Sequence, residues 1–452
     1  MTSLFSGDCY KDNIVPGKTV TNFHCNHFNK HKELHVDCSY RNLTVVPDTP
    51  ADTVYLYLQH NLIGQILNKT FALLNRLDVL DLSFNKITAI NIDSFTGLQN
   101  LRFLYLSGNS RYQELSLPKN VFNHLGSLTV LDLSYNNINS IHEYTFGGLV
   151  KLQHLKLNNN GIDKLPNDTF QYTPKLVILD LFYNSLYSVT KGMSTGLGTL
   201  HQLNLGANFI ENIENNAFQL LINLTVLNLF FNSLHLVNQQ MFAGLPKLRH
   251  INLMTNQMKE ISNHTFENLT DLSILDLSNN KLQSLNEKTF LGLKNLKVLR
   301  LNNNKLRYNT QQLPPGCYKP LKSLKQLSVQ KNNHRRKDLY TFILPDETVK
   351  DLKMLEILEL DANADDERIL GIGFSSLHNL SSMIFRGFCN FSLYNDTFKY
   401  TPNLTHLNLS FNTIITMNED LFAGLQNLRF LFLSSNSQYP IDESLKILET
   451  QN

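Results

Sequence analysis

The chain has 452 residues, enough for two or three ordinary globular domains, with 42% hydrophobic and 17% charged residues. Its formal net charge of +2 argues against a nucleic-acid-binding protein that relies on bulk charge, although a local basic patch is compatible with it. No stretch of the sequence approaches the ~20 apolar residues that a membrane-spanning helix needs.

The segment 1–52 is predicted to form an N-terminal cap, with a disordered leader at residues 1–8. Three of the five cysteines, Cys9, Cys25 and Cys38, lie in this segment. Cysteines clustered at one end indicate a cap held by a disulfide, which forms in an oxidising compartment. Because the total is odd, at least one cysteine has no partner within the chain. The pairing of Cys9, Cys317 and Cys389 stays open.

From residue 53 to residue 452 the pattern L-x-x-L-x-L-x-x-N recurs in about sixteen units. Eleven of the fifteen intervals between the Asn positions are 24 residues, and the period becomes irregular over residues 305–390. A random chain would not hold such a period, so it predicts a repeat solenoid. The Asn position is occupied by Asn61, Asn85, Asn109, Asn136, Asn160, Asn184, Asn208, Asn232, Asn256, Asn280, Asn304, Asn332, Asn363, Phe388, Asn412 and Asn436.

Each unit is predicted to begin with a short strand whose Leu side chains point inward, and successive strands stack in parallel at ~4.8 Å. The Asn amide should pair with backbone groups of the turn that follows, which makes a ladder. A second apolar stripe should stack beneath the convex side. Because the strand side is narrower than the return path, the fold class is a curved α/β solenoid. This horseshoe has a parallel β-sheet on its concave face and an irregular or helical convex side. The second stripe consists of Phe71, Phe95, Phe122, Phe146, Phe170, Phe218, Phe242, Phe266, Phe290, Phe374, Phe398 and Phe422.

The outward strand positions near the N-terminus carry Tyr55, Tyr57, Phe103 and Tyr105. Aromatic residues on a rigid concave sheet offer a large contact area at low entropic cost. We therefore predict ligand binding at these four residues. The alternative is that Tyr55 and Tyr57 pack on the cap.

Further along the array the outward positions are polar. Asp81, Asp132, Asp180 and Asp276 share one of these positions, and we interpret them as solvated residues without a special role.

The densest run of positive charge is Lys-Asn-Asn-His-Arg-Arg-Lys at 331–337. Its Arg335 and Arg336 are predicted to contact an anionic ligand, such as nucleic acid or a lipopolysaccharide phosphate. A solvated loop is an equally good interpretation of so short a run.

The motif Asn-x-Ser/Thr occurs eleven times, which is typical of a glycosylated secreted or cell-surface protein. Several of these asparagines share a phase relative to the ladder, so their sugars should form stripes. The edge directly after the strands carries only Asn390, and we expect this edge to be a docking or dimerisation face. Asn408 falls on the concave sheet and is left out of the predicted sites. The predicted glycosylation sites are Asn42, Asn68, Asn167, Asn223, Asn263, Asn268, Asn379, Asn390, Asn395 and Asn403.

The two ends of the chain lack features that a complete extracellular protein would show. The first residues have neither the basic nor the apolar region of a signal peptide, and no cysteine cluster follows Asn436. We therefore expect a fragment, without a C-terminal cap, of a longer extracellular or cell-surface protein.

The unit L-x-x-L-x-L-x-x-N-x-L-x-x-L-x-x-x-x-F-x-x-L-x-x covers residues ~53–440 and resembles the typical class of animal extracellular leucine-rich repeats. The segment with Cys25, Cys38 and Leu-Thr-Val-Val-Pro at 43–47 is similar to the N-terminal cap of Toll-like receptors. The irregular units after Asn304 resemble the irregular repeats in the middle of these receptors. The resemblance implies a disulfide between Cys25 and Cys38. It also implies the ectodomain of an innate immune receptor that binds a microbial or endogenous ligand and dimerises. Such receptors signal through a membrane helix and a TIR domain, and this chain lacks both.

Motifs of catalysis are missing from the sequence, which has no Gly-x-Ser-x-Gly, phosphate loop, His-Glu-x-x-His or Cys-x-x-Cys. His24, His27 and His31 lie beside Cys25, but a disulfide explains that cysteine better than a metal does. We predict no enzyme, no metal and no cofactor. Two functions compete: a receptor ectodomain, and a secreted or adhesive protein with a protein ligand. Either would bind its partner on the concave face or the glycan-free edge, and we expect a ligand-dependent homodimer.

Overall fold

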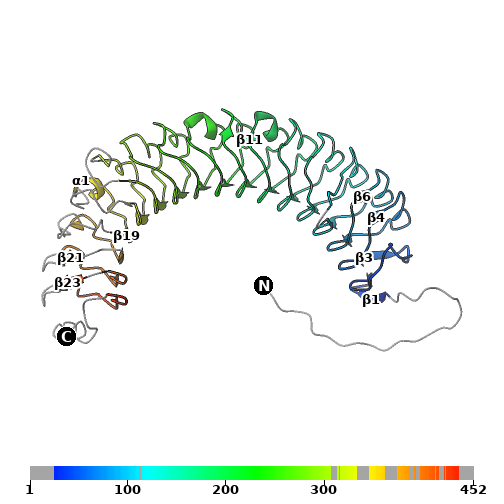
Figure 1. Cartoon of the computed structure of the whole chain (residues 1–452), viewed down its shortest axis with the longest axis horizontal. Helices are drawn as coiled ribbons and strands as arrows, with labels where there is room; N and C mark the ends of the chain where they lie inside the picture. The colour runs from blue at the N-terminus through cyan, green and yellow to red at the C-terminus, as the bar shows by residue number, and fades with distance from the viewer. Residues whose placement is uncertain are drawn as a thin grey trace.

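In this computed structural model the chain winds through successive turns that bend into an arc, with the strands on the inner side (Figure 1). This architecture confirms the predicted horseshoe. The structure describes residues 25–110, 113–306, 313–314, 316–332, 346–361, 374–386, 391–392, 398–412, 414–416, 422 and 424–436.

Eighteen strands form one continuous sheet on the concave face. The first two belong to the cap and pair antiparallel, whereas every later neighbour pairs in parallel. The sixteen strands after the cap correspond to the sixteen units that the repeat predicts. The strands are β1 (Asn26–Lys30), β2 (Glu33–Asp37), β3 (Thr53–Tyr57), β5 (Val79–Asp81), β7 (Phe103–Tyr105), β8 (Val130–Asp132), β9 (His154–Lys156), β10 (Ile178–Asp180), β12 (Gln202–Asn204), β14 (Val226–Asn228), β15 (His250–Asn252), β16 (Ile274–Asp276), β17 (Val298–Arg300), β18 (Gln326–Ser328), β19 (Ile357–Asp361), β20 (Ser382–Arg386), β22 (His406–Asn408) and β24 (Phe430–Phe432).

The convex side consists mainly of turns, with a few short regular elements. Three pairs of very short parallel strands and three single helical turns interrupt the described part of it. These elements are β4 (Gln65–Ile66), β6 (Ala89–Ile90), β11 (Ser188–Val189), β13 (Asn212–Ile213), β21 (Phe391–Ser392), β23 (Ile414–Thr416), the 3-10 turns η1 (Lys191–Ser194) and η2 (Gln239–Phe242), and α1 (Asp346–Val349).

The predicted asparagine ladder is present in every described unit. Asn85 is a representative member: its Nδ2 donates to the carbonyl of Leu58 at 2.9 Å and to that of Leu82 at 3.1 Å. Its Oδ1 accepts the backbone N–H of Ile63 at 3.1 Å. Each amide therefore closes its own turn and holds the preceding one, which satisfies backbone groups buried between turns. Position 363 and Phe388 lie outside the described residues.

The predicted phenylalanine stripe forms a stacked spine within the core. Phe71, Phe95, Phe122 and Phe146 follow one another with ring centroids 5.9 to 6.5 Å apart. The fully buried Tyr318 continues the spine 6.0 Å from Phe290. No single turn could bury these rings, so the core exists only through stacking.

Successive turns alternate between two backbone forms from Asn61 to Asn304. In every second unit the twelfth residue after the ladder asparagine is a glycine with positive φ, as at Gly97 and Gly148. The units between them place a left-handed residue eight positions after the asparagine instead, as at Lys69, except that the longer unit after Asn109 places it eleven positions on, at Asn120. A Cβ on Gly97 would lie 2.5 Å from the carbonyl oxygen of Ala72, so this turn accepts only glycine. The structural period is therefore two units.

Candidate binding groove on the strand edge

The residue directly before each ladder asparagine lies on the edge of the arc, just after the strand. It has a left-handed backbone in every described unit. This conformation costs a non-glycine side chain on the order of 1–2 kcal/mol, and asparagine tolerates it better than most. We call these positions the edge row. It comprises Tyr40 of the cap and then His60, Phe84, Gly108, Tyr135, Asn159, Tyr183, Ala207, Phe231, Thr255, Asn279, Asn303, Lys331, Phe411 and Ser435.

Large and small side chains alternate along the edge row between residues 84 and 231. The aromatic side chains Phe84, Tyr135, Tyr183 and Phe231 are 51%, 57%, 60% and 62% exposed. Gly108, Asn159 and Ala207 stand between them. These rings are more than half exposed and stand on a backbone conformation that is unfavourable for them. Such an arrangement indicates a binding role.

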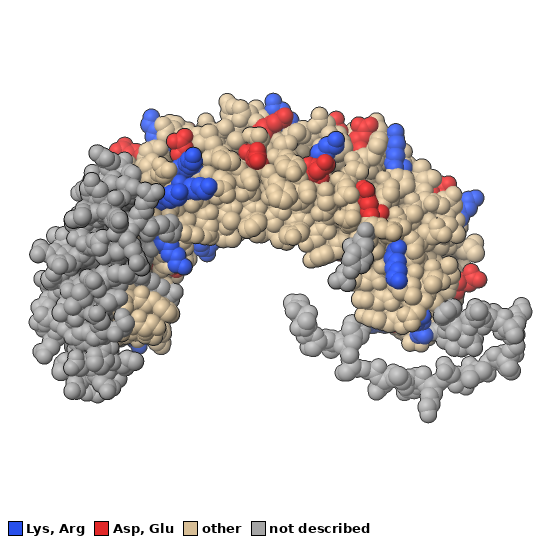
Figure 2. Space-filling model, in the orientation of Figure 1, with Lys and Arg blue, Asp and Glu red and all other residues tan. Residues whose placement is uncertain are grey.

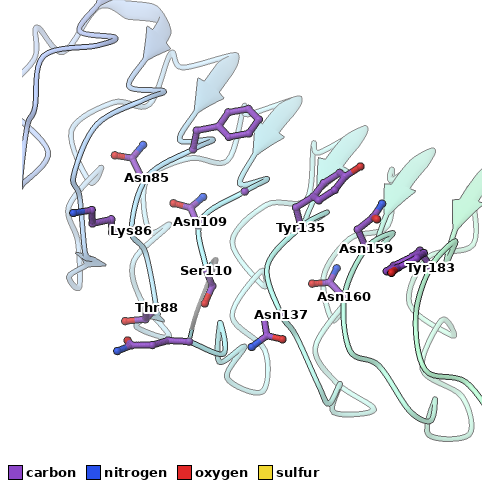
Figure 3. A pocket seen from close by; sticks show the side chains of 13 residues that line it. Asn85, Lys86, Thr88, Asn109, Ser110, Tyr135, Asn137, Asn159, Asn160 and Tyr183 are labelled. Atoms are coloured by element: carbon purple, nitrogen blue, oxygen red, sulfur yellow. The ribbon is translucent and has the colours of Figure 1, made fainter.

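The first part of this row borders a groove of about 1050 Å³, shown in Figure 3. Phe84, Tyr135 and Tyr183 lie along it, and Gly108 forms part of its floor. The Phe84 ring leans over Gly108, where a Cβ would come within 2.7 Å of Cδ1. Glycine at this position of the edge row therefore gives the Phe84 ring room to lie over the backbone beside the groove.

Polar side chains complete the lining of the groove. Gln113, Asn137 and Asn159 supply amides, and Lys86 is the one charged residue among the described lining. The Oγ of Ser110 is buried and has no hydrogen-bond partner among the described residues. Rings that supply contact area, combined with Ser, Gly and Asn that supply adaptable hydrogen bonds, are the composition of antibody paratopes. The groove is therefore chemically suited to a protein surface.

The four predicted aromatic ligand residues do not form a single cluster. Tyr55 stacks on His35 of the cap, with ring centroids 4.0 Å apart, and Tyr57 lies 6.2 Å from the same ring. Phe103 and Tyr105 are on β7, separated from β3 by β5. Tyr55 and Tyr57 thus pack on the cap, which was the alternative interpretation. Ligand binding at the four residues stays a prediction.

Burial shifts the pKa values of several of these concave groups. It raises the pKa of the Tyr105 hydroxyl, with a further contribution from the charge of Asp81. It lowers the pKa of His35, and the positive charge of Lys30 adds to this effect. Both groups are therefore held in their neutral forms near neutral pH.

The interpretation of the four concave aspartates as solvated residues was wrong. Asp132 and Asp276 are buried, and the other two are half-buried. In each case the carboxylate accepts the backbone N–H two residues ahead, as Asp132 does from Ser134 at 3.0 Å. Each aspartate carboxylate thus fixes the turn between its strand and the edge row, so the role of these aspartates is structural.

The predicted glycosylation sites that the structure describes lie mostly on the surface. Asn68, Asn167 and Asn263 are exposed at one phase of the repeat. Asn223 is half-buried, and its Nδ2 donates to the carbonyl of Gly198 at 2.8 Å. Asn379 and Asn403 donate in the same way to the preceding turn. None of the groove residues is in a glycosylation motif.

The expectation that the strand edge carries only Asn390 needs one correction. The Oδ1 of Asn61 accepts from the N–H groups of Arg41 and Leu43, so Arg41 occupies the ladder position of the cap. The exposed Asn42 follows it and therefore lies on the same edge. This position could not be recognised from the sequence because the cap has no ladder asparagine. Asn408 has its predicted place on the concave β22, where it accepts the N–H of Ser410 at 3.0 Å.

Several predictions concern residues that the structure does not describe. Arg335, Arg336, Asn390, Asn395, Cys9, Cys389 and the leader at 1–8 all lie outside the described residues. Their predicted roles stay predictions.

The cap contains the disulfide that the resemblance implied, between Cys25 and Cys38. Cys317 is a buried free thiol, and burial raises its pKa to about 12, which keeps it protonated and unreactive. Among the described residues there is no cluster of His, Cys, Asp or Glu that could hold a metal ion. That part of the chain also has no helix long and apolar enough to cross a membrane.

The leucine-rich repeat model matches residues 53–110, 115–162, 151–208, 198–258, 253–306, 279–334 and 391–437. These matches cover more than half of the chain, and the protein belongs to the leucine-rich-repeat family.

Two sequence relatives are epiphycan and keratocan. Epiphycan of Gallus gallus is 36% identical over 130 residues, which are 28% of this chain and 39% of epiphycan. Keratocan of Mus musculus is 32% identical over 147 residues, which are 28% of this chain and 42% of keratocan. The matched region thus spans about two fifths of the length of these relatives.

Solved structures share the fold over most of the chain. A leucine-rich-repeat protein of Leptospira interrogans has a TM-score of 0.68 at 26% identity, covering 86% of this chain and 94% of its own. Mouse RP105, solved in complex with MD-1, has a TM-score of 0.52 at 25% identity, covering 88% and 69%. Drosophila Toll, solved with Spatzle, has a TM-score of 0.69 at 21% identity, covering 92% and 60%, and shows the fold alone.

Proposed function

We propose that this protein is a secreted or adhesive extracellular leucine-rich-repeat protein that binds a protein partner along its strand edge, at the groove between Phe84 and Tyr183. The alternative function named from the sequence thus becomes the preferred one. Support for an extracellular location comes from the Cys25–Cys38 disulfide, the exposed glycosylation motifs and the similarity to keratocan and epiphycan, which are extracellular matrix proteins. The family serves binding rather than catalysis.

The observation that carries this proposal is the composition and place of the groove. Exposed rings, amides and a single lysine line it, on an edge without glycosylation motifs in the described units after the cap. A partner could reach it without meeting the sugars expected at Asn68 or Asn263. Figure 2 shows positive and negative side chains scattered singly over the viewed face, which does not favour a polyanionic ligand.

A glycan introduced into the groove would test the proposal. The substitution Asn139→Thr makes Asn137, an exposed groove residue, the acceptor of a new motif. We expect the glycosylated variant to lose partners that the wild-type protein binds in an array of purified extracellular proteins. As a matched control, Lys297→Thr creates a motif at Asn295, which shares the repeat phase of Asn223. Unchanged binding by the Asn139→Thr protein would refute the proposal.

A receptor ectodomain of the Toll type is the second candidate. It is supported by the resemblance of the cap and by the likeness to RP105, which was solved in complex with another protein. In that case a membrane helix and a TIR domain would be encoded downstream, and ligand binding would produce a homodimer. Sedimentation of the purified chain with and without a bound partner tests the predicted dimer.

A further inference from the structure

The spacing of the edge row restricts the shape of the segment that it can bind. Neighbouring strands of a sheet lie ~4.8 Å apart, so aromatic residues on every second turn recur at roughly 10 Å. The recurring rings Phe84, Tyr135, Tyr183 and Phe231 alternate with the small residues between them. The edge therefore presents a series of notches, each with an aromatic wall and a small residue at its base.

The orientation of the rings is visible at the N-terminal end of this series. Tyr40, His60 and Phe84 stack with centroids 4.3 and 4.6 Å apart and interplanar angles of 10° and 7°. The Phe84 ring also lies over Gly108, where a Cβ would come within 2.7 Å of it. A flat, rigid group entering this notch would therefore meet the face of a ring.

A polyproline II helix matches this period with every side chain that faces the row, whereas an α-helix reaches it only at every second turn, after ~10.5 Å. An α-helix advances ~5.4 Å per turn. A β-strand presents side chains on one face every ~6.6 Å. A polyproline II helix has three residues per turn at ~3.1 Å each, so every third residue recurs after ~9.3 Å. Aromatic-lined grooves are a known way to bind this helix, which is already ordered before binding and loses little entropy.

We propose that the edge row binds a proline-rich segment of the partner in the polyproline II conformation, with every third residue in successive notches. This inference rests on the proposed function and names the chemistry of the partner. The backbone of such a segment makes no internal hydrogen bonds. Gln113, Asn137 and Asn159 line the groove, and their amides can donate to its carbonyls.

Charge sets the direction in which the segment lies. Lys86 is exposed and is the one charged residue among the described lining, near the Phe84 end of the groove. An acidic residue at that end of the bound segment would pair with it, whereas a basic residue would be repelled.

Synthetic peptides of three Pro-x-x turns, with Glu or Lys at either end, would test the proposal by fluorescence anisotropy with the whole chain. We expect one Glu-ended peptide to bind best, and Lys86→Glu to reverse the preference toward a Lys-ended peptide. Tyr135→Ala and Tyr183→Ala should each weaken binding by about tenfold or more, the effect of removing an aromatic anchor. Phe411→Ala is the matched control, since it has the same repeat position and 61% exposure but lies far along the arc.

The decisive variant is Asn159→Tyr, which adds an aromatic ring and fills the notch between Tyr135 and Tyr183. Tyrosine already adopts this backbone at both neighbouring positions. Loss of peptide binding supports the notch geometry, whereas equal or tighter binding would show mere adhesion to aromatic surface and overturn it.

Failure of every peptide to bind overturns the proposal, as does binding of a β-linked linear oligosaccharide in their place. The glycan test at Asn137 is independent of both results. If that glycan blocks a protein partner while the peptides fail, the groove retains its proposed function and only the conformation of the partner is wrong.

Discussion

The two halves of the edge row have the same backbone but different side chains. Tyr135 and Tyr183 in the first half have φ of 58° and 54°, and Asn279 and Asn303 in the second half have φ of 55° and 54°. Asn279 and Asn303 are the residue type that this conformation favours, and the Asn303 amide donates to Asn279 at 2.5 Å. The first half uses bulky rings at the same angles. The turn fixes where the edge row points, and the side chain placed there is free to serve binding.

This comparison assumes that the ladder asparagine fixes the turn, whichever residue occupies the edge-row position before it. Asn232→Ala would remove the acceptor of the Ile210 N–H at 2.9 Å and the donor to the Leu205 and Leu229 carbonyls at 2.9 and 3.1 Å. We expect the free energy of unfolding to fall by about 3–5 kcal/mol, since several buried backbone groups lose their partner. Urea unfolding followed by circular dichroism measures it. Asn279→Ala in the edge row is the control, and it should lower the free energy of unfolding by less than about 1 kcal/mol. Equal losses in the two variants would contradict the view that the ladder, and not the edge row, holds the turn.

An intermediate effect is expected where the edge row is empty. In Gly108→Ala the new Cβ would lie 2.7 Å from Phe84 Cδ1 on a backbone with φ of 70°. We expect a loss of about 1–2 kcal/mol from the left-handed backbone, and displacement of the Phe84 ring, visible in a crystal structure. Thr255→Ala, with φ of 56° at an equivalent position, provides the comparison. An unmoved Phe84 would show that the ring does not depend on Gly108.

Exchanging the two halves should have small and opposite effects on stability. Tyr183→Asn places asparagine in a left-handed turn and should stabilise by about 0.5–1 kcal/mol, whereas Asn279→Tyr should destabilise by a similar amount. The unfolding midpoints of the two variants measure this. If both substitutions changed the stability in the same direction, the rings would contribute to folding and would not be present for binding alone.

The smallest effect expected is a dependence of the cap on pH. Burial and Lys30 lower the pKa of His35 in the folded chain, so the unfolded chain binds more protons below the ordinary value of 6.5. The stabilisation from the neutral ring is present above that value and is lost as the pH falls below it. Comparison of urea midpoints at about pH 7.5 and about pH 5 should show a smaller loss in His35→Phe, which keeps the stack on Tyr55. The same loss in both proteins would assign the pH dependence to other groups.

The fold could be predicted because the repeat carries its physics in every unit. Ladder asparagines, inward leucines and the phenylalanine stripe each appear many times at one phase, so isolated exceptions such as Tyr318 do not obscure them. The structural role of Asp132 was missed because it depends on one hydrogen bond to Ser134, which no periodicity reveals. Tyr55 and Phe103 share one repeat phase, but phase does not show how a ring packs, so the stacking of Tyr55 on His35 of the cap could not be preferred over ligand binding.

The groove itself was missed, although a signal for it is present in the sequence. At the position before the ladder asparagine, aromatic and small residues alternate, and this pattern repeats only at twice the unit length. The sequence could not show that the Phe84 ring lies over Gly108, because this depends on the side-chain conformation of Phe84.

The alternation of two backbone forms limits how an array of this kind can change its length. Removing one unit would bring two like turns together and place two edge-row rings on adjacent turns, about 5 Å apart, which closes the notch between them. Removing two units, such as residues 137–184, keeps the glycine pattern and leaves Tyr135 and Phe231 two turns apart. Duplication or loss within such a gene would therefore keep its ligand only in even steps, and a designer who shortens the arc must cut in pairs.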